Sequence, residues 1–180
     1  MLRVVIPAVE FFDESKNEFL QVKEHTLVLE HSLVSLSKWE AKTNKPFLSK
    51  DPKTREETIE YIRCMTITQN VDPNIYYHIP ASVLEKINNY ISAPMTATWF
   101  SNNRQNNTNR EIVTSEVIYY WMISLGIPFE CQKWHLNRLF TLIRVCNEKN
   151  AKPKKMSKRE LASRNASLNA ARRKAMRSRG

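Results

Sequence analysis

The segment TLVLEHSLVSLSKWEAK, residues 26–42, changes its apolar period part-way along. In its first part the apolar side chains alternate, at Leu27 and Leu29, which indicates a strand with one buried face. In its second part they recur at helical spacing, at Leu33 and Leu36. This segment therefore predicts a strand that leads directly into a helix, and it marks the point where the chain turns from β to α.

The residues before this segment have the composition of strands. RVVIPAVEFFD (residues 3–13) and EFLQV (residues 18–22) are apolar, β-branched and aromatic, and they flank the polar turn DESKN. Pro7 restricts the first run to an edge position or a break, because proline cannot donate to a ladder. We expect a small antiparallel sheet over residues 2–31.

The residues after this segment carry helix signals. A capping box at Thr54 and Glu57 opens a helix through residue 70, and Pro80 opens another. A third helix is expected from a capping box at Thr108 to Gly126, and its apolar run at residues 117–123 predicts burial on most sides. The chain is thus expected to be an α+β protein, mainly α-helical, with its small N-terminal sheet packed on a helical bundle.

The strongest helical pattern is ECQKWHLNRLFTLIRVCNEK, residues 130–149. At about 100° per residue, one continuous helix here would have a single polar stripe. Leu136 and Phe140 flank that stripe. This helix is predicted to be the spine of the core.

Two polar residues, His135 and Arg138, project from the apolar side of this predicted helix. A buried guanidinium needs a partner, because burying an unpaired charge is very costly. We therefore predict an internal polar clasp of His135, Arg138 and a carboxylate, with Glu116 or Glu30 as the acid. Cys131 and His135 stand four apart, which is also compatible with a metal or a nucleophile, but no further ligand stands at a recognisable spacing.

The composition excludes several classes of site. The chain has two glycines, so it has no glycine-rich phosphate loop, dinucleotide fingerprint or nucleophile elbow. Its three cysteines lack the spacing of a zinc site or a disulfide framework.

No apolar run is long enough for a membrane span, and the N-terminus reaches Glu10 too early for a secretory signal. We expect a cytoplasmic protein with no cofactor.

The excess of positive over negative charge lies entirely in the C-terminal part. Of the 28 basic and 18 acidic residues, 12 basic and one acidic lie in residues 149–180, so this part has a net charge of +11 and residues 1–148 have −1. We therefore divide the chain into a globular domain, residues 1–148, and a flexible basic helical tail, residues 149–180. Ser157 and Glu160 form a capping box for the tail helix.

The tail helix has a narrow apolar seam at Leu161, Leu168 and Ala175. A seam of this kind favours docking on a protein over binding to DNA. The tail residues that we predict to contact a partner are basic or belong to the seam: Lys154, Lys155, Arg159, Leu161, Leu168, Arg172 and Arg173.

Several segments together resemble a family encoded by tailed bacteriophages, the tail assembly chaperones of phages with long non-contractile tails. The segments are EHSLVSLSKWEAKTNKPF (30–47), QNVDPNIYY (69–77), APMTATWF (93–100), YYWMISLGIPFECQKWHLNRLFTLIRVCN (119–147) and SRNASLNAARRKAMRSRG (163–180). This resemblance covers most of the chain, and its motifs are structural ones.

The resemblance implies a role in the host bacterial cytoplasm. The protein would bind the tape measure protein, keep its apolar helices soluble and help to recruit tail tube subunits, with self-association as a further possibility. No residue would be catalytic. The tail and the apolar residues Leu136 and Phe140 would be candidate contact sites for these partners. The alternative from another class is a virion structural or nucleic-acid-associated protein that uses the basic tail as an arm.

The charge and the pattern of the tail generate a first prediction. Truncation after Asn150 is expected to leave residues 1–148 folded, because the apolar periodicity that predicts a core lies before this point. The thermal unfolding of the truncated chain, followed by circular dichroism, should match that of the full chain. A truncated protein without a cooperative transition would contradict this division of the chain.

Overall fold

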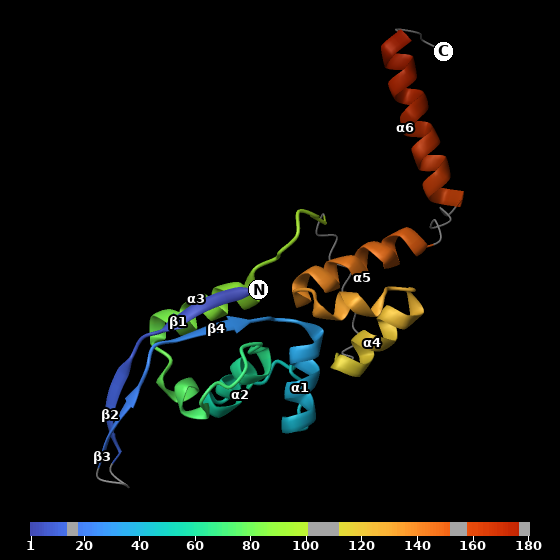
Figure 1. Ribbon diagram of the computed structural model, residues 1–180. Coiled ribbons are helices and arrows are strands. Elements are labelled where there is room, and N and C mark those ends of the chain that lie inside the picture. Colours follow the sequence, from blue (N-terminus) through green and yellow to red (C-terminus); the bar gives the residue numbers. More distant parts are fainter. Residues whose placement is uncertain (14–17, 101–111, 152–157, 177–180) are drawn as a thin grey trace. The chain divides into compact units, whose positions relative to one another are not determined.

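The computed structural model describes four stretches of the chain, residues 1–13, 18–100, 112–151 and 158–176 (Figure 1). The chain divides into two compact units, Met1–Asn147 and Glu148–Gly180. The separate folding of residues 1–148 stays a prediction.

Four strands follow one another in the first unit: β1 (Leu2–Ile6), β2 (Val9–Asp13), β3 (Glu18–Val22) and β4 (His25–Leu29). β1 pairs antiparallel with β4, and β2 pairs antiparallel with β3. Pro7 lies between β1 and β2, where it interrupts no ladder. The inward residues of β1 and β4 alternate with outward ones, and the buried members are Val4, Ile6, Leu27 and Leu29.

The helix α1 (Leu33–Thr43) is shared by two hydrophobic clusters. It begins with a capping box, in which Ser32 and Ser35 each accept a hydrogen bond from the other's backbone N–H. Leu36 belongs to one cluster and Trp39 to the other, and both side chains are buried. Because α1 contributes to both clusters, it fixes one relative to the other.

The first cluster lies between the β1–β4 pair and three helical segments, namely α2 (Arg55–Met65), η1 (Pro73–His78) and α3 (Ala81–Ser92). The predicted capping box of α2 is confirmed. The Thr54 N–H donates to the Glu57 carboxylate at 2.9 Å, and the Glu57 N–H donates to the Thr54 hydroxyl at 3.2 Å. The Trp39 indole N–H donates to the Glu57 carbonyl at 2.9 Å, which ties α1 to the start of α2.

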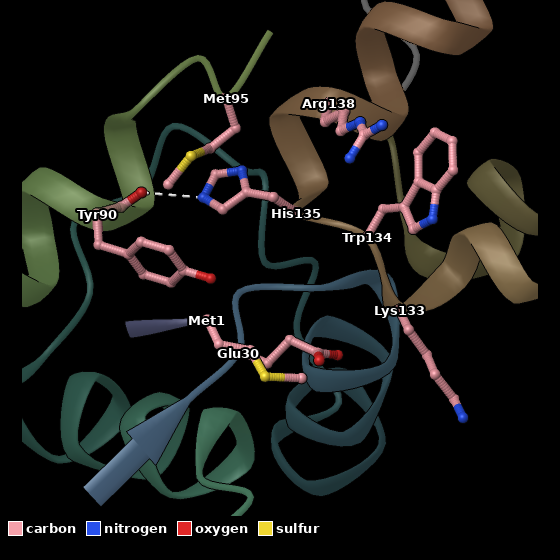
Figure 2. Close-up of a pocket in the computed structure, with 8 residues that line it drawn as sticks. All are labelled: Met1, Glu30, Tyr90, Met95, Lys133, Trp134, His135 and Arg138. Atoms are coloured by element: carbon pink, nitrogen blue, oxygen red, sulfur yellow. Dashed lines mark hydrogen bonds between the residues drawn. The ribbon is translucent and has the colours of Figure 1, made fainter. Parts of the chain in front are cut away.

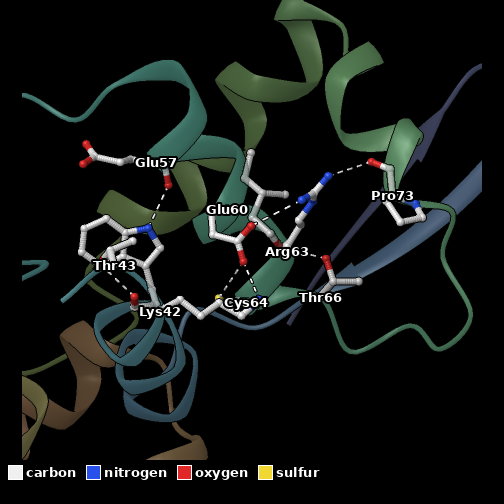
Figure 3. A network of polar contacts seen from close by, with 10 residues as sticks. Lys42, Thr43, Glu57, Glu60, Arg63, Cys64, Thr66 and Pro73 are labelled. Atoms are coloured by element: carbon white, nitrogen blue, oxygen red, sulfur yellow. Dashed lines mark hydrogen bonds and ion pairs between the residues drawn. The ribbon is translucent and has the colours of Figure 1, made fainter. Parts of the chain in front are cut away.

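A polar network joins α1, α2 and η1 along the edge of this cluster (Figure 3). The Lys42 ammonium contacts the Glu60 carboxylate at 2.5 Å, and Arg63 contacts the same carboxylate at 3.4 Å. The Arg63 guanidinium also donates to the Pro73 carbonyl at 3.0 Å. One carboxylate on α2 therefore links cations from two helices, and Arg63 extends this link to η1.

The second cluster is built from α1, α4 (Ser115–Ser124), η2 (Phe129–Lys133) and α5 (Leu136–Asn150). The prediction of one helix over residues 130–149 is wrong. Trp134, with φ −69° and ψ 158°, is extended and separates η2 from α5. The helical faces that were extrapolated across this break are therefore not those of α5.

The helix α4 starts later than predicted. Thr114 is its N-cap residue, and residues 112–114 are not helical. The predicted cap at Thr108 and Glu111 lies outside the described residues. Gly126 follows the helix with φ +65°, which is the left-handed conformation expected of a glycine after a helix.

A buried carboxylate on α1 organises the second cluster. Glu40 is almost fully buried, and it accepts the Ser115 N–H at 2.7 Å and the Phe47 N–H at 2.9 Å. Ser115 is the first residue of α4, where the N–H groups have no partner in the helix and the helix dipole favours a negative charge. Glu40 therefore caps a helix that lies 75 residues further along the chain.

The second unit contains α6 (Lys158–Met176), whose described side chains are exposed. Taken together, the elements confirm the predicted class: an α+β protein, mainly helical, with a small antiparallel sheet packed on helices.

Replacement of Glu40 tests the role of this carboxylate. Glu40→Ala is expected to lower the free energy of unfolding by about 2–4 kcal/mol, because a buried backbone N–H without an acceptor costs about 1–3 kcal/mol. Glu40→Gln keeps one carbonyl oxygen and should lose less. Urea unfolding monitored by tryptophan fluorescence measures both changes.

The matched control is Glu85→Ala, which removes an exposed carboxylate from α3. A surface substitution of this kind is expected to change stability by about 0.5 kcal/mol or less. Equal losses for Glu40→Ala and Glu85→Ala would contradict the capping role.

Candidate partner-binding groove

The described part of the first unit contains an apolar groove of about 720 Å³. Its apolar lining comes from four places in the chain: Leu48, Ile112 with Val113, Trp121 and Phe140. Leu48 and Ile112 are exposed, whereas Trp121 and Phe140 also pack against the second cluster. Trp121 and Phe140 therefore form a floor that is anchored in the core. Leu48 and Ile112 form a rim that is open to a partner.

The Glu40 carboxylate positions both walls of the groove. Phe47 donates its N–H to Glu40 and packs edge-on against Trp39, with ring centroids 5.1 Å apart. Leu48 follows Phe47 in the chain, so the contacts of Phe47 also place Leu48 at the groove. On the other wall, Ser115 donates its N–H to Glu40 and follows the segment that carries Ile112.

A second apolar surface lies on α4. Tyr120 and Ile123 are 66% and 63% exposed, and Phe129, which follows α4, is also exposed. The prediction that residues 117–123 are buried on most sides is therefore wrong. The reason is that α4 packs with one face, which contains Ile118 and Met122, and leaves the opposite face uncovered.

The structure places the predicted contact residues in different environments. Phe140 lines the groove. Leu136 is 1% exposed and belongs to the core, so it is not a contact residue. Lys154 and Lys155 lie outside the described residues. The remaining five are exposed on α6: Arg159, Leu161, Leu168, Arg172 and Arg173.

The predicted clasp of His135, Arg138 and Glu116 is wrong. Arg138 is exposed and stacks over the Trp134 ring at 4.1 Å, and among the described residues it forms no ion pair. Glu116 is exposed and accepts from the Ser115 hydroxyl at 3.3 Å. The break at Trp134 turns Arg138 to the surface, where the guanidinium stays hydrated and needs no acid.

The His135 ring lines a smaller cavity of about 310 Å³ (Figure 2). Its Nε2–H donates to the Tyr90 carbonyl at 2.9 Å, so Nδ1 carries the lone pair of the neutral ring. Nδ1 is buried and has no partner among the described residues. Burial lowers the pKa of His135. In Figure 2 the Lys133 side chain extends away from the His135 ring.

The side chains around His135 do not form a catalytic site. Burial raises the pKa of the Cys131 thiol, so this sulfur is not an activated nucleophile. Among the described residues, no group of three or more His, Cys, Asp or Glu side chains is placed to hold a metal ion.

A buried histidine lies where the two clusters meet. His31 Nδ1 and the Tyr61 hydroxyl share a hydrogen bond of 2.6 Å, and the His31 ring meets the His135 ring edge-on with centroids 4.9 Å apart. Burial, and secondly the neighbouring His135, lower the pKa of His31 from 6.5 to about 4. His31 is therefore neutral in the folded protein near neutral pH.

The groove could not have been found from one stretch of sequence, because its lining residues are scattered between residue 48 and residue 140. The sequence did contain a signal that α4 leaves an apolar face uncovered. A seven-residue apolar run on a ten-residue helix holds more apolar side chains than one buried face can cover.

Comparison of the chain with models of known protein families, with curated proteins and with solved structures returned no match. None of the described helices has the combination of length and apolar content that crossing a membrane requires.

The His31 environment predicts an acid-sensitive fold. Above pH 6.5 His31 is neutral in both states and adds no penalty. Between pH 6.5 and about 4 the unfolded chain binds a proton that the folded chain excludes, so stability falls by up to about 3 kcal/mol as the pH decreases. NMR titration of the His31 ring should give a midpoint near pH 4.

The variant His31→Asn separates this effect from the titration of carboxylates. Its amide keeps a polar group near Tyr61 but does not titrate in this range. The variant should lose less stability than the original protein between pH 7 and pH 4. A His31 midpoint near 6.5, or identical pH profiles for the two proteins, would show that burial does not control this histidine.

Proposed function

We propose that this protein is a phage tail assembly chaperone that binds the tape measure protein in the apolar groove of its first unit. The observation that carries the proposal is the groove itself, which is open at Leu48 and Ile112 and floored by Trp121 and Phe140. The resemblance of the sequence to tail assembly chaperones supplies the identity of the partner.

The groove suits an amphipathic helix. Apolar side chains of a partner helix, spaced three or four residues apart, would bury against Trp121 and Phe140. Lys50 and Asp51 also line the groove and would pair with polar groups beside the helix's apolar face. Covering that face in the host bacterial cytoplasm would keep long apolar helices soluble before a tail forms around them.

The exposed face of α4 offers a second contact. Tyr120 and Ile123 present a ring and a branched chain that no described residue covers. Aromatic residues with one polar end are enriched at protein interfaces. We assign this face to the recruitment of tail tube subunits. The proposed role is one of binding, without an enzymatic step.

The rival function is that of a virion structural or nucleic-acid-associated protein with a basic arm. The observation that favours it is the charge of α6, which has six basic residues and one acidic residue. The rival and the chaperone use different units of the chain, so they can be tested separately.

Co-expression with the tape measure protein of the same phage tests the chaperone. The double variant Leu48→Asp with Ile112→Asp places charges on the exposed rim and leaves the floor intact. A carboxylate that is buried unpaired against an apolar partner helix costs at least about 1 kcal/mol at each position, so the two changes together should weaken binding roughly 30-fold or more. The yield of soluble complex after affinity purification measures this loss.

The control variant is Ile67→Asp, which changes an exposed apolar residue outside the groove. This variant should co-purify with the tape measure protein as the original does. If the double variant also co-purifies normally, or if the original protein brings down no tape measure protein, the proposed function is wrong.

A further inference from the structure

The helix α6 has an unusual distribution of charge. Its 19 residues carry six basic side chains and one acidic one. Among the residues whose side chains the structure describes, no ion pair is formed by Lys158, Arg159, Arg172, Arg173 or Lys174. These five cations are therefore available to a ligand of opposite charge.

The six basic side chains of α6 are spread around the whole helix axis. At about 100° per residue, Arg172 lies roughly 20° from Leu161 and Arg159 roughly 160° from it, whereas Arg164 and Lys174 lie roughly 60° and 140° from it in the other direction. Arg172 therefore borders the seam of Leu161 and Leu168. A flat anionic surface, such as a membrane, would contact only one side of such a helix, and an apolar groove in a protein would bury Arg172 at a high cost.

A ligand that surrounds the helix satisfies this arrangement. The major groove of duplex DNA is about 12 Å wide and admits an α-helix, with phosphates along both edges. Apart from Glu160, Leu161, Arg164 and Leu168, the side chains between the two basic ends of α6 are small or carry hydrogen-bonding amides: Ala162, Ser163, Asn165, Ala166, Ser167, Asn169, Ala170 and Ala171. A helix with so few bulky residues can approach the floor of the groove.

We propose that α6 binds duplex DNA by lying in the major groove, with its arginines and lysines on the phosphates of both strands. Asn165 and Asn169 stand four apart, one turn along the helix, and reach toward the edges of the bases. This activity belongs to the second unit and is independent of the groove in the first.

Fluorescence anisotropy of the full chain with a labelled 30-base-pair duplex tests the proposal over a range of NaCl concentrations. Contacts from about five cations predict that log K falls with log [salt] with a slope of roughly −4 to −5. The triple variant Arg172→Gln, Arg173→Gln and Lys174→Gln should make the slope shallower by about 3, since each lost phosphate contact removes about 0.9.

The variant Leu161→Ala with Leu168→Ala is the matched control. It removes the apolar seam, keeps every charge and preserves helix propensity. Its affinity for DNA should remain within about threefold of the original, because phosphate contacts dominate the binding energy. A large loss of DNA binding in this control would overturn the proposal and favour a protein groove as the partner.

Competition experiments separate duplex DNA from other anions. Polyglutamate and vesicles containing anionic lipid, at the same concentration of charge, should displace the duplex poorly, because polyglutamate has a lower charge density than duplex DNA and a vesicle contacts only one side of the helix. Displacement by either competitor as effectively as by unlabelled duplex would overturn the proposal. So would a full chain that fails to bind the duplex at 50 mM NaCl, or an unchanged salt slope in the triple variant.

Discussion

The carboxylate of Glu40 is the interaction on which the architecture of the first unit depends. It is buried on α1, and it accepts one N–H from the segment that follows α1 and one from the first residue of α4. A buried carboxylate is stable only when it is fully hydrogen-bonded, so both segments must reach their places for Glu40 to be satisfied. The same two hydrogen bonds position Leu48 and the segment of Ile112, which form the rim of the groove. Folding and the proposed binding site are thereby coupled through one side chain.

The sequence predicted those parts of the structure whose signals are local. The strands before residue 31, the capping box at Thr54 and the helix that begins at Leu33 all depend on neighbouring residues, and the structure confirms them. The errors arose where a pattern was extended across a break. One extended residue, Trp134, ends the apparent helix of residues 130–149, and it moves Leu136 into the core and Arg138 to the surface.

The groove and the contacts of Glu40 were beyond local reasoning for a different reason. Glu40 and Ser115 lie 75 residues apart, and no periodicity connects them. Phe140 was predicted as a contact residue because it flanks a polar stripe, yet its actual place depends on the packing of α4, α5 and the segment after α1. Sequence patterns show which face of an element is apolar, whereas the partner that covers that face is set by the tertiary fold. The apolar run of α4 indicated that some of its side chains stay uncovered, and the structure shows that Tyr120 is one of them.

The central claim is that the rim and floor of the groove form the surface that binds an apolar partner helix. Hydrogen–deuterium exchange of the full chain, alone and with an apolar helical segment of the tape measure protein, tests it residue by residue. The account predicts slower exchange in residues 47–51 and 112–121 when the segment is bound, and unchanged exchange in residues 158–176. Unchanged exchange in the first two ranges, with new protection confined to residues 158–176, would contradict it.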